Sequence, residues 1–288
     1  MGTNPAPRAA LILNPAVGTI SDSIYAGSSL YNSLQTTVSY STPKGFSGKV
    51  SYTWSHSIDD SSSQLSGASF SNALSGLPAF DLRIGRADSD FDVRHVFTAN
   101  GVAPLPNIAR GGLYTSVLRH WSLNNIFSVR SGTPFSAIVG GDTLGLLGSA
   151  PFNFPYRVGN AKTCTRPHNI NYIDTTCFAF PTTVPYTLGG VQYNGPRLGT
   201  ARRNSLEGPG LFFWTMGLLK DQPITERVRA QFQAQAFNLI NHTNFANPAS
   251  ANTQIFGATG TLNAAAGLLT APAAQPGRQL QFALKIIF

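Results

Sequence analysis

The last eight residues of the chain, 281–288, place a large apolar side chain at every second position. These positions are Phe282, Leu284, Ile286 and Phe288, and the residues between them are mainly smaller or polar. Because side chains alternate between the two faces of a β-strand, this segment predicts a strand with one apolar face. Chain ends tend to fray unless something captures them, and a soluble domain rarely ends on its most hydrophobic strand. We therefore interpret it as a closing strand of a transmembrane β-barrel.

The composition also favours strands over helices. Of 288 residues only 11% are charged, whereas 28 are glycine, 19 are proline and 11% are aromatic. This mixture is typical of strands joined by irregular loops. The longest apolar run, residues 211–219, suits a membrane-spanning strand of ~9–11 residues and is about half of what a spanning helix needs. The predicted fold class is all-β, an antiparallel transmembrane barrel segment with long extracellular loops.

Six further segments show strand-like alternation, some more weakly than the last. The seven predicted strands are 34–40, 46–55, 93–102, 121–130, 212–220, 225–239 and 281–288. In the sixth strand the polar face carries Arg227, Arg229, Gln231, Gln233 and Gln235, a row that suits a water-filled lumen better than a protein core. Single-chain barrels use an even number of strands, so residues 9–14, residues 133–139 or strands upstream would supply an eighth. The chain is not expected to close a barrel alone.

The connections between the predicted strands alternate in length. Residues 41–45 and 221–224 are tight turns and 103–120 is a connection of medium length, whereas 56–92, 131–211 and 240–278 are long. Outer-membrane barrels have short periplasmic turns and long extracellular loops. We therefore expect Pro43, Pro223 and Phe288 on the periplasmic side, and Ser62 and Asn169 outside.

Composition and motifs also bear on other classes of function. The formal charge of +8 is scattered and Arg202–Arg203 is its only dense spot, so nucleic-acid binding is not expected. Residues 1–20 lack the apolar core of a secretory signal, so either the protein stays inside the cell or the sequence is a fragment. We favour a fragment, because the rest of the sequence is typical of an exported protein. The sequence has no G-x-S-x-G, H-E-x-x-H or phosphate-loop motif, so we expect neither an enzyme nor a bound cofactor.

Several segments resemble the carboxy-terminal barrel of TonB-dependent outer-membrane receptors, and most closely the Oar-like group with a carboxypeptidase-regulatory-like domain. They occur in family-like order and spacing from Tyr31 onward. These segments are 31–35 (YNSLQ), 51–60 (SYTWSHSIDD), 89–95 (SDFDVRH), 130–135 (RSGTPF), 203–210 (RNSLEGPG) and 236–245 (AFNLINHTNF).

The resemblance implies a function and a set of partners. A barrel of about 22 strands would surround a plug. The TonB energy-transducing complex would pull on a short sequence segment before the plug, called the box, to drive nutrient uptake. Residues 31–288 would supply the last third of this barrel, with 1–30 as an irregular outward-facing remnant. The implied location is the bacterial outer membrane, where lipid, the barrel-assembly machinery, the remaining receptor and an unknown nutrient would be partners. The assembly machinery would read Phe282, Leu284, Ile286 and Phe288.

Two other classes of function stay open at this point. The chain could be a cell-surface adhesion or interaction module, in which the loops bind a partner and nothing is transported. A soluble β-sandwich binding module is the third interpretation, and it requires the Gln and Arg row to face solvent. A plug and box encoded upstream would favour transport, whereas solubility without detergent would favour the sandwich.

Three groups of side chains are candidates for specific roles. Cys164 and Cys177 lie in the longest loop and suggest a disulfide, with two free thiols or a metal site as alternatives. Asp88, Asp90 and Asp92 have the every-second-residue spacing of a calcium loop. The glycine and the final glutamate of such a loop are missing, which favours a solvated strand end with Arg94 or Arg86 as ion-pair partners. Aromatic residues near strand ends are expected to form interface girdles: Tyr40, Tyr52, Trp54, Trp121 and Trp214.

Overall fold

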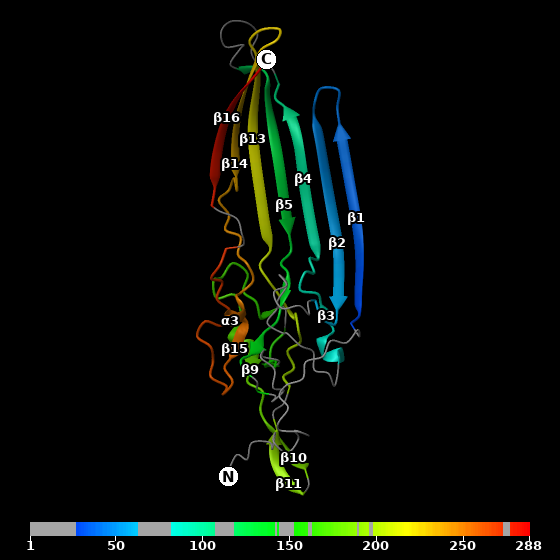
Figure 1. The fold of residues 1–288 in the computed structure, drawn as a ribbon, viewed down its shortest axis with the longest axis vertical. Helices are drawn as coiled ribbons and strands as arrows, with labels where there is room; N and C mark the ends of the chain where they lie inside the picture. The colour runs from blue at the N-terminus through cyan, green and yellow to red at the C-terminus, as the bar shows by residue number, and fades with distance from the viewer. Residues whose placement is uncertain are drawn as a thin grey trace, which may run out of the picture.

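The computed structural model describes residues 27–62, 82–106, 118–141, 143, 153–160, 163–188, 190–195, 198–272 and 277–288. Seven long strands form one antiparallel sheet in the order β1-β2-β4-β5-β13-β14-β16. Each strand therefore pairs with the next long strand along the chain, as in an up-and-down barrel wall (Figure 1). The strands are β1 (Ser29–Ser41), β2 (Ser47–Asp59), β4 (His95–Pro104), β5 (Trp121–Arg130), β13 (Leu211–Pro223), β14 (Arg229–Phe237) and β16 (Gln279–Ile287).

All seven strands predicted from the alternation are present, and the all-β fold class is confirmed. Their lengths run from 9 to 13 residues, which matches the ~9–11 residues that cross a bilayer when tilted. The sheet has a short eighth member, β3 (Ala87–Asp88), which pairs with the end of β2.

The register places most of the large apolar side chains of the seven strands on one face of the sheet, while Ile126, Phe213 and Leu219 lie on the other. Cross-strand partners share a face, and Phe282 of β16 lies opposite Ala234, which in turn lies opposite Leu218 of β13. The same row continues through Leu123 of β5 to Ala103 of β4. The opposite face is polar in β14 and most of β1 and β2. On that polar face lie Ser33, Gln35, Thr37, Ser39, Lys49, Ser51, Thr53, Asn100, Asn124, Gln231, Gln233, Gln235 and Gln281.

The sheet is open at both edges. Every residue of β1 and of β16 is exposed, and no pairing among the described residues joins these two strands. This agrees with the expectation that the chain does not close a barrel alone. Residues 133–139 do not add a strand to this sheet, which corrects one of the two candidates, and residues 9–14 lie outside the described part.

The correction has a physical reason in the side chains of residues 133–139. Phe135, Ile138 and Val139 are each at most 2% exposed, so the segment is apolar on both faces and belongs in a core. It forms two short strands, β6 (Pro134–Phe135) and β7 (Ile138–Val139), which pair with β12 (Leu206–Glu207) and, in parallel, with β15 (Gln254–Phe256).

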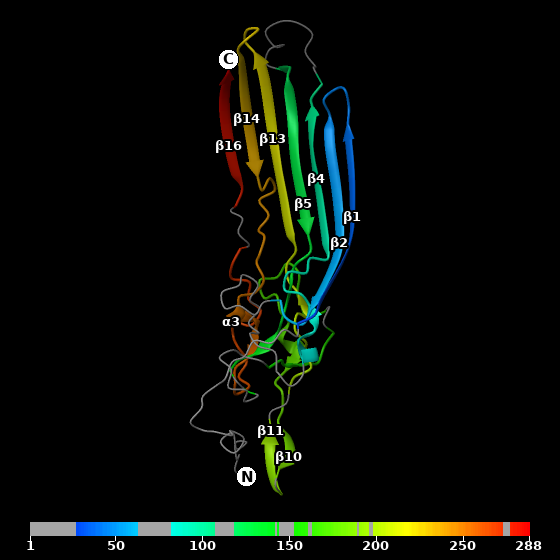
Figure 2. The same ribbon diagram turned by 45° about the vertical axis from the view of Figure 1, so that its right-hand side comes forward.

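Both tight turns lie at the same end of the sheet as the end of β16, here called the turn end (Figure 2). In the first turn Gly45 has φ +87°, a conformation that glycine adopts without cost. The second turn covers residues 224–228 and not 221–224, because β13 continues until Pro223 pairs with Arg229. The hydroxyl of Thr225 then accepts hydrogen bonds from the amides of Arg227 and Val228.

The long loops gather at the other end of the sheet into one folded unit, here called the loop body (Figure 1). Its core holds side chains from connections far apart in the chain, including Phe135, Phe154, Phe178, Leu206 and Ile255. The large apolar side chains of the seven long strands are exposed or partly exposed, and none of them is in the buried core. The protein thus buries its core among the loops and turns the apolar face of its sheet outward, as expected for a wall facing lipid.

The loop body contains several short elements besides β6, β7, β12 and β15. No helix in the described ranges is long and apolar enough to cross a membrane. These elements are η1 (Leu82–Gly85), β8 (Tyr156–Arg157), η3 (Thr175–Cys177), β9 (Phe178–Ala179), β10 (Val184–Leu188), β11 (Val191–Gly195) and α3 (Ser250–Thr253).

A disulfide joins Cys164 and Cys177 inside the loop body, with their Cα atoms 5.7 Å apart. Both cysteines are buried, and β8 and β9 pair beside them. The disulfide cross-links the longest connection, between β5 and β13, and both of its cysteines belong to the core of the loop body.

We predict that this disulfide forms when the protein is exported. In the chain-entropy model a closed loop of this length stabilises the folded state by about 3 kcal/mol. Mass spectrometry under non-reducing conditions should find two hydrogens missing relative to the reduced chain. Two thiols that react with an alkylating agent in correctly exported protein would contradict the prediction.

Candidate functional site

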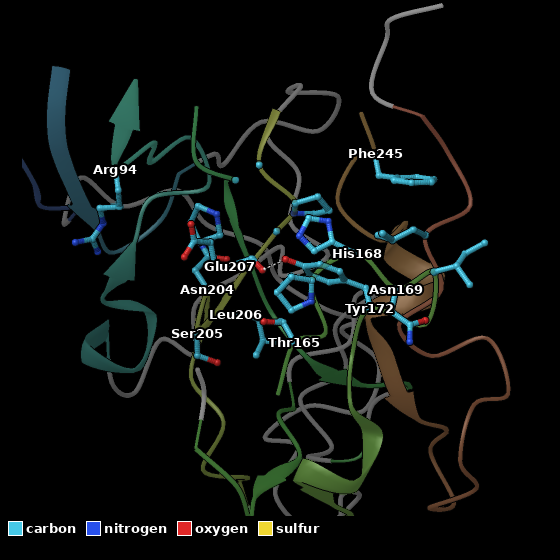
Figure 3. Close-up of a pocket in the computed structure, with 18 of the residues that line it drawn as sticks. Arg94, Thr165, His168, Asn169, Tyr172, Asn204, Ser205, Leu206, Glu207 and Phe245 are labelled. Carbon is cyan, nitrogen blue, oxygen red and sulfur yellow. Dashed lines mark hydrogen bonds between the residues drawn. The ribbon is translucent and has the colours of Figure 1, made fainter. Parts of the chain in front are cut away.

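A cavity of ≈ 1140 Å³ lies within the loop body, beside the ends of the spanning strands. Figure 3 shows Arg94 on one side of this region, Tyr172, Glu207 and His168 at its centre, and Phe245 and Asn169 on the far side. The lining residues are Asp88, Asp92, Arg94, Gly132, Pro134, Thr165, Pro167, His168, Asn169, Ile170, Tyr172, Asn204, Ser205, Leu206, Glu207, Gly208, Pro209, Gly210, His242, Thr243, Phe245 and Leu269.

A close glycine contact and hydrogen bonds from asparagine side chains to the backbone hold the cavity walls in place. Gly132 packs so closely on Gly208 that a methyl group at Gly132 would overlap the carbonyl of Gly208. Asn244 continues the sheet with its side chain, since its amide accepts from the backbone N–H of Phe212 and donates to the carbonyl of Phe212. Asn238 bonds His242 through both backbone groups in the same way. These contacts fix the segment that carries His242, Thr243 and Phe245.

On one side of the cavity Arg94 connects three side chains. Its Nε donates to Asp92 at 2.6 Å, and its Nη2 lies 2.8 Å from Asp88 and 2.9 Å from the Nε2 of His56. Burial alone would lower the pKa of Arg94, but its hydrogen bonds to the Asp92 and Asp88 carboxylates raise it above the ordinary value. The guanidinium is therefore a fixed positive charge.

The contacts of Arg94 bear on the two interpretations of Asp88 and Asp92, a calcium loop or ion pairs with arginine. His56, Asp88 and Asp92 have ligand atoms within 4.8 Å of one another, a spacing that could hold a metal ion. The Arg94 guanidinium already bonds all three, so a cation would have to displace it. The expected ion pairs of Asp88 and Asp92 with Arg94 are present. The expectation of a solvated strand end was wrong, because Asp92 is only 3% exposed and Asp90 is held by the buried Arg203. Arg86 pairs instead with Asp60.

A second arginine forms a buried network beside the first. Arg203 Nη1 lies 2.8 Å from Asp59, and its Nη2 lies 3.2 Å from Asp90; the three side chains are only 7%, 5% and 10% exposed. Asn204 donates to the same Asp90 carboxylate at 2.6 Å. The network links the end of β2 to a segment 144 residues later, and so fastens the loop body to the sheet.

Tyr172 forms part of the cavity floor, where it is 5% exposed. Its hydroxyl donates to the backbone carbonyl of Glu207 at 2.9 Å. Burial, together with the negative charge of the Glu207 carboxylate, raises the pKa of Tyr172 to about 12. The neutral phenol is thus the form that the folded loop body favours.

A known protein family has the same kind of sequence as this chain. The family model described as "Outer membrane beta barrel domain" matches residues 1–281. The chain belongs to this family. It is an outer-membrane barrel domain, and membership implies that it resides in the outer membrane of bacteria. No curated protein and no solved structure matches it.

The predicted girdle residues of this outer-membrane barrel domain lie on its apolar face at two levels. Tyr40 and Trp121 are at the turn end, where Trp121 pairs with Lys220. Tyr52, Trp54 and Trp214 lie nearer the loop body. Around them are more aromatic contacts, with ring centroids 5.2 Å apart for Phe127 and Phe212 and 6.2 Å apart for Phe127 and Trp214. Two aromatic levels fit the two interfaces of a bilayer, and contact with lipid stays a prediction.

The predicted assembly residues share the apolar face of the barrel's last strand. Phe282, Leu284 and Ile286 stand at every second position of β16, and each is exposed, as is Phe288 just beyond it. The Phe282 ring stacks on Phe232 of β14, with centroids 6.4 Å apart. Their recognition by the assembly machinery stays a prediction.

Sequence analysis did not single out most of the cavity residues. Tyr172, His168 and Ser205 stand in loop segments without periodicity. One signal was available, because the segments 89–95, 130–135, 203–210 and 236–245 that carry the family resemblance all contribute to the lining. Converging motifs from separate loops could have indicated a shared site.

We predict that the loop body loses stability in alkali through Tyr172. Because its folded pKa is raised above the ordinary 10, the contribution is complete below pH 10 and is lost as pH rises towards 12. A shift of this size corresponds to about 2–3 kcal/mol. Resistance of the loop body to protease in membrane vesicles should therefore fall between pH 10 and 12. The variant Tyr172→Phe should fall less over that range; an identical fall would contradict this role.

Proposed function

We propose that this domain is the carboxy-terminal part of the barrel of a TonB-dependent, Oar-like receptor that imports a nutrient through the outer membrane. The observation that carries the proposal is the open sheet, with a polar inner face and two unpaired edges. An eight-stranded barrel fills its interior with side chains, whereas rows of Gln, Ser and Thr suit a wide lumen that holds water and a plug. Unpaired strand edges in hydrocarbon are costly, so further strands must cover them.

The cavity supports the same function. Four of the six segments that resemble TonB-dependent receptors line it or adjoin its lining, and the others are β1 and β2. A receptor needs a preformed site on its loops before transport can begin. A rigid loop body with its own core and a large cavity provides such a site.

The partners follow from this proposal. Lipid covers the apolar face, the barrel-assembly machinery reads the last strand, and the remaining receptor strands pair with β1 and β16. The plug occupies the lumen beside the polar face and connects the domain to the TonB complex. We expect no catalysis and no nucleic-acid binding.

The test uses the full-length receptor of which this domain would be the carboxy-terminal part, here called the parent protein. It is extracted from the outer membrane of its host. It should bind the purified periplasmic domain of the host's TonB protein, and deletion of a short amino-terminal box should abolish this binding. If the parent encodes neither plug nor box, or binds equally well without the box, the proposal fails. The loop body would then favour the alternative, a surface adhesion or interaction module.

A further inference from the structure

The turn end of the sheet has an excess of positive charge. In the turns and the adjoining halves of the seven strands, the described residues include only two acidic side chains, Asp221 and Glu226. The basic side chains of the same region are Lys44, Lys49, Arg119, Lys220, Arg227, Arg229 and Lys285. In the rest of the described chain, acidic and basic side chains occur in similar numbers. The excess is therefore a local property of the turn end.

These positive charges divide between the two faces of the wall. Lys49, Arg229 and Lys285 lie on the polar face, and Arg229 is 3.6 Å from the carboxylate of Asp221 on that face. The other four lie on the apolar face, next to β5 or in a tight turn. Those four can reach the lipid that surrounds an outer-membrane barrel.

Lys220 stands at the boundary of the apolar face. It is the only Lys, Arg, Asp or Glu on that face of the seven described strands. It lies six residues beyond Trp214 along β13, or about 20 Å at the rise of a strand, which is close to the ~25 Å height of the apolar band. Its Nζ donates to the backbone carbonyl of Arg119 at 2.9 Å and lies 5.3 Å from the centre of the Trp121 ring. These contacts hold the ammonium at the depth expected for lipid headgroups.

The residues around Lys220 are typical of a membrane interface. Arg119 stands two residues before Trp121, and Arg227 lies in the turn that follows β13. The side chain of Arg227 is exposed and makes no hydrogen bond or ion pair with a described residue. Leu118 and Ile224, in the same connections, are exposed apolar side chains. Basic groups beside an apolar surface suit a ligand that has an anionic headgroup and acyl chains.

We propose that Lys220, Arg119 and Arg227 bind the anionic headgroup of a phospholipid. Its acyl chains lie against Leu218 and Phe232, which share the apolar face with Lys220. The connection lengths predict that the turn end lies in the periplasmic leaflet, and phospholipids form that leaflet. The inference requires that the domain spans the outer membrane, and it does not require TonB-dependent transport.

The experiment reconstitutes the full-length parent in phosphatidylcholine vesicles that contain a brominated lipid. A bimane label on Leu218→Cys reports quenching by bromine next to Lys220, on the same face of β13. Brominated phosphatidylglycerol should quench more than brominated phosphatidylcholine at equal mole fraction, and this preference should fall as salt is raised. Lys220→Gln and Arg227→Gln should each lower the relative binding constant of phosphatidylglycerol about 5-fold.

Lys49→Gln and Lys285→Gln are the matched controls, because they remove the same charge at the same end of the wall but from the polar face. Their relative binding constants should equal that of the wild type. Equal quenching by the two brominated lipids, or an equal loss in the controls, would overturn the proposal. Stronger displacement of brominated phosphatidylglycerol by lipid A than by unlabelled phosphatidylglycerol would also overturn it, because lipid A belongs to the opposite leaflet. Arg227 is an exposed turn residue, so its variant keeps the test valid if Lys220→Gln does not fold.

Discussion

Replacing Arg203 with methionine is expected to destabilise the loop body by about 3–5 kcal/mol. The change removes the positive charge that bonds the buried carboxylates of Asp59 and Asp90. It also removes a donor to the carbonyl of Gly85. The measurement is the urea concentration at which protease begins to cut the loops in outer-membrane vesicles.

The neighbouring arginine provides the control for this experiment. Arg202 is exposed, so Arg202→Met should change the urea midpoint little. Adding Asp59→Asn and Asp90→Asn to Arg203→Met should restore part of the lost urea resistance, because the two buried negative charges that Arg203 bonds are then absent. If Arg203→Met and Arg202→Met behave alike, the network does not fasten the loop body.

The second large effect concerns two adjacent leucines in the middle of β13. Leu218 lies on the apolar face opposite Ala234, and Leu219 lies on the other face opposite Gln233. An arginine on the lipid face near the bilayer midplane costs about 2–4 kcal/mol, whereas one in the lumen is tolerated. Leu218→Arg should therefore strongly reduce the amount of folded parent receptor in the outer membrane, and Leu219→Arg should reduce it much less.

The two variants have the same composition and differ in which of two adjacent leucines is replaced, and so in which face of the sheet carries the arginine. The variants have the same charge and the same strand position, so general effects of adding an arginine cancel. Heat-modifiable migration of the extracted receptor reports the folded fraction. Equal loss in both variants, or a larger loss in Leu219→Arg, would contradict the assigned faces.

The sheet was predictable because the membrane imposes a simple pattern on each strand. Alternation in segments such as 46–55 and 281–288 depends only on neighbouring residues and on the two solvents that the faces meet. The second turn was displaced, since Asp221–Pro223 looks like a loop in sequence but still pairs within the sheet. Strand ends depend on partner strands, which local sequence does not reveal.

The loop body was not predictable in the same way. Its core joins Phe135 and Leu206, from opposite ends of one long connection, with Ile255 from another, and these residues have no shared period. The Arg203–Asp59 pair spans 144 residues, so only the three-dimensional arrangement brings it together. Asp88 and Asp92 were correctly expected near Arg94 because these residues are close in sequence.

We propose that the barrel wall crosses the outer membrane with its loop body outside the cell and its tight turns in the periplasm. Single cysteines tell the two sides apart: Pro43 and Pro223 are exposed at the turn end, and Asn169 and Arg202 are exposed in the loop body. Ser62 lies on the loop-body side, but its hydroxyl bonds Arg203, so it is a poorer reporter.

The deciding measurement is labelling of intact cells with a membrane-impermeant maleimide. The parent receptor carries one introduced cysteine at a time, and the wild type, with its Cys164–Cys177 bridge, gives the background. Positions 169 and 202 should be labelled in intact cells, and positions 43 and 223 only after the outer membrane is opened. Labelling at 43 or 223 in intact cells, or none at 169 and 202, would contradict this orientation.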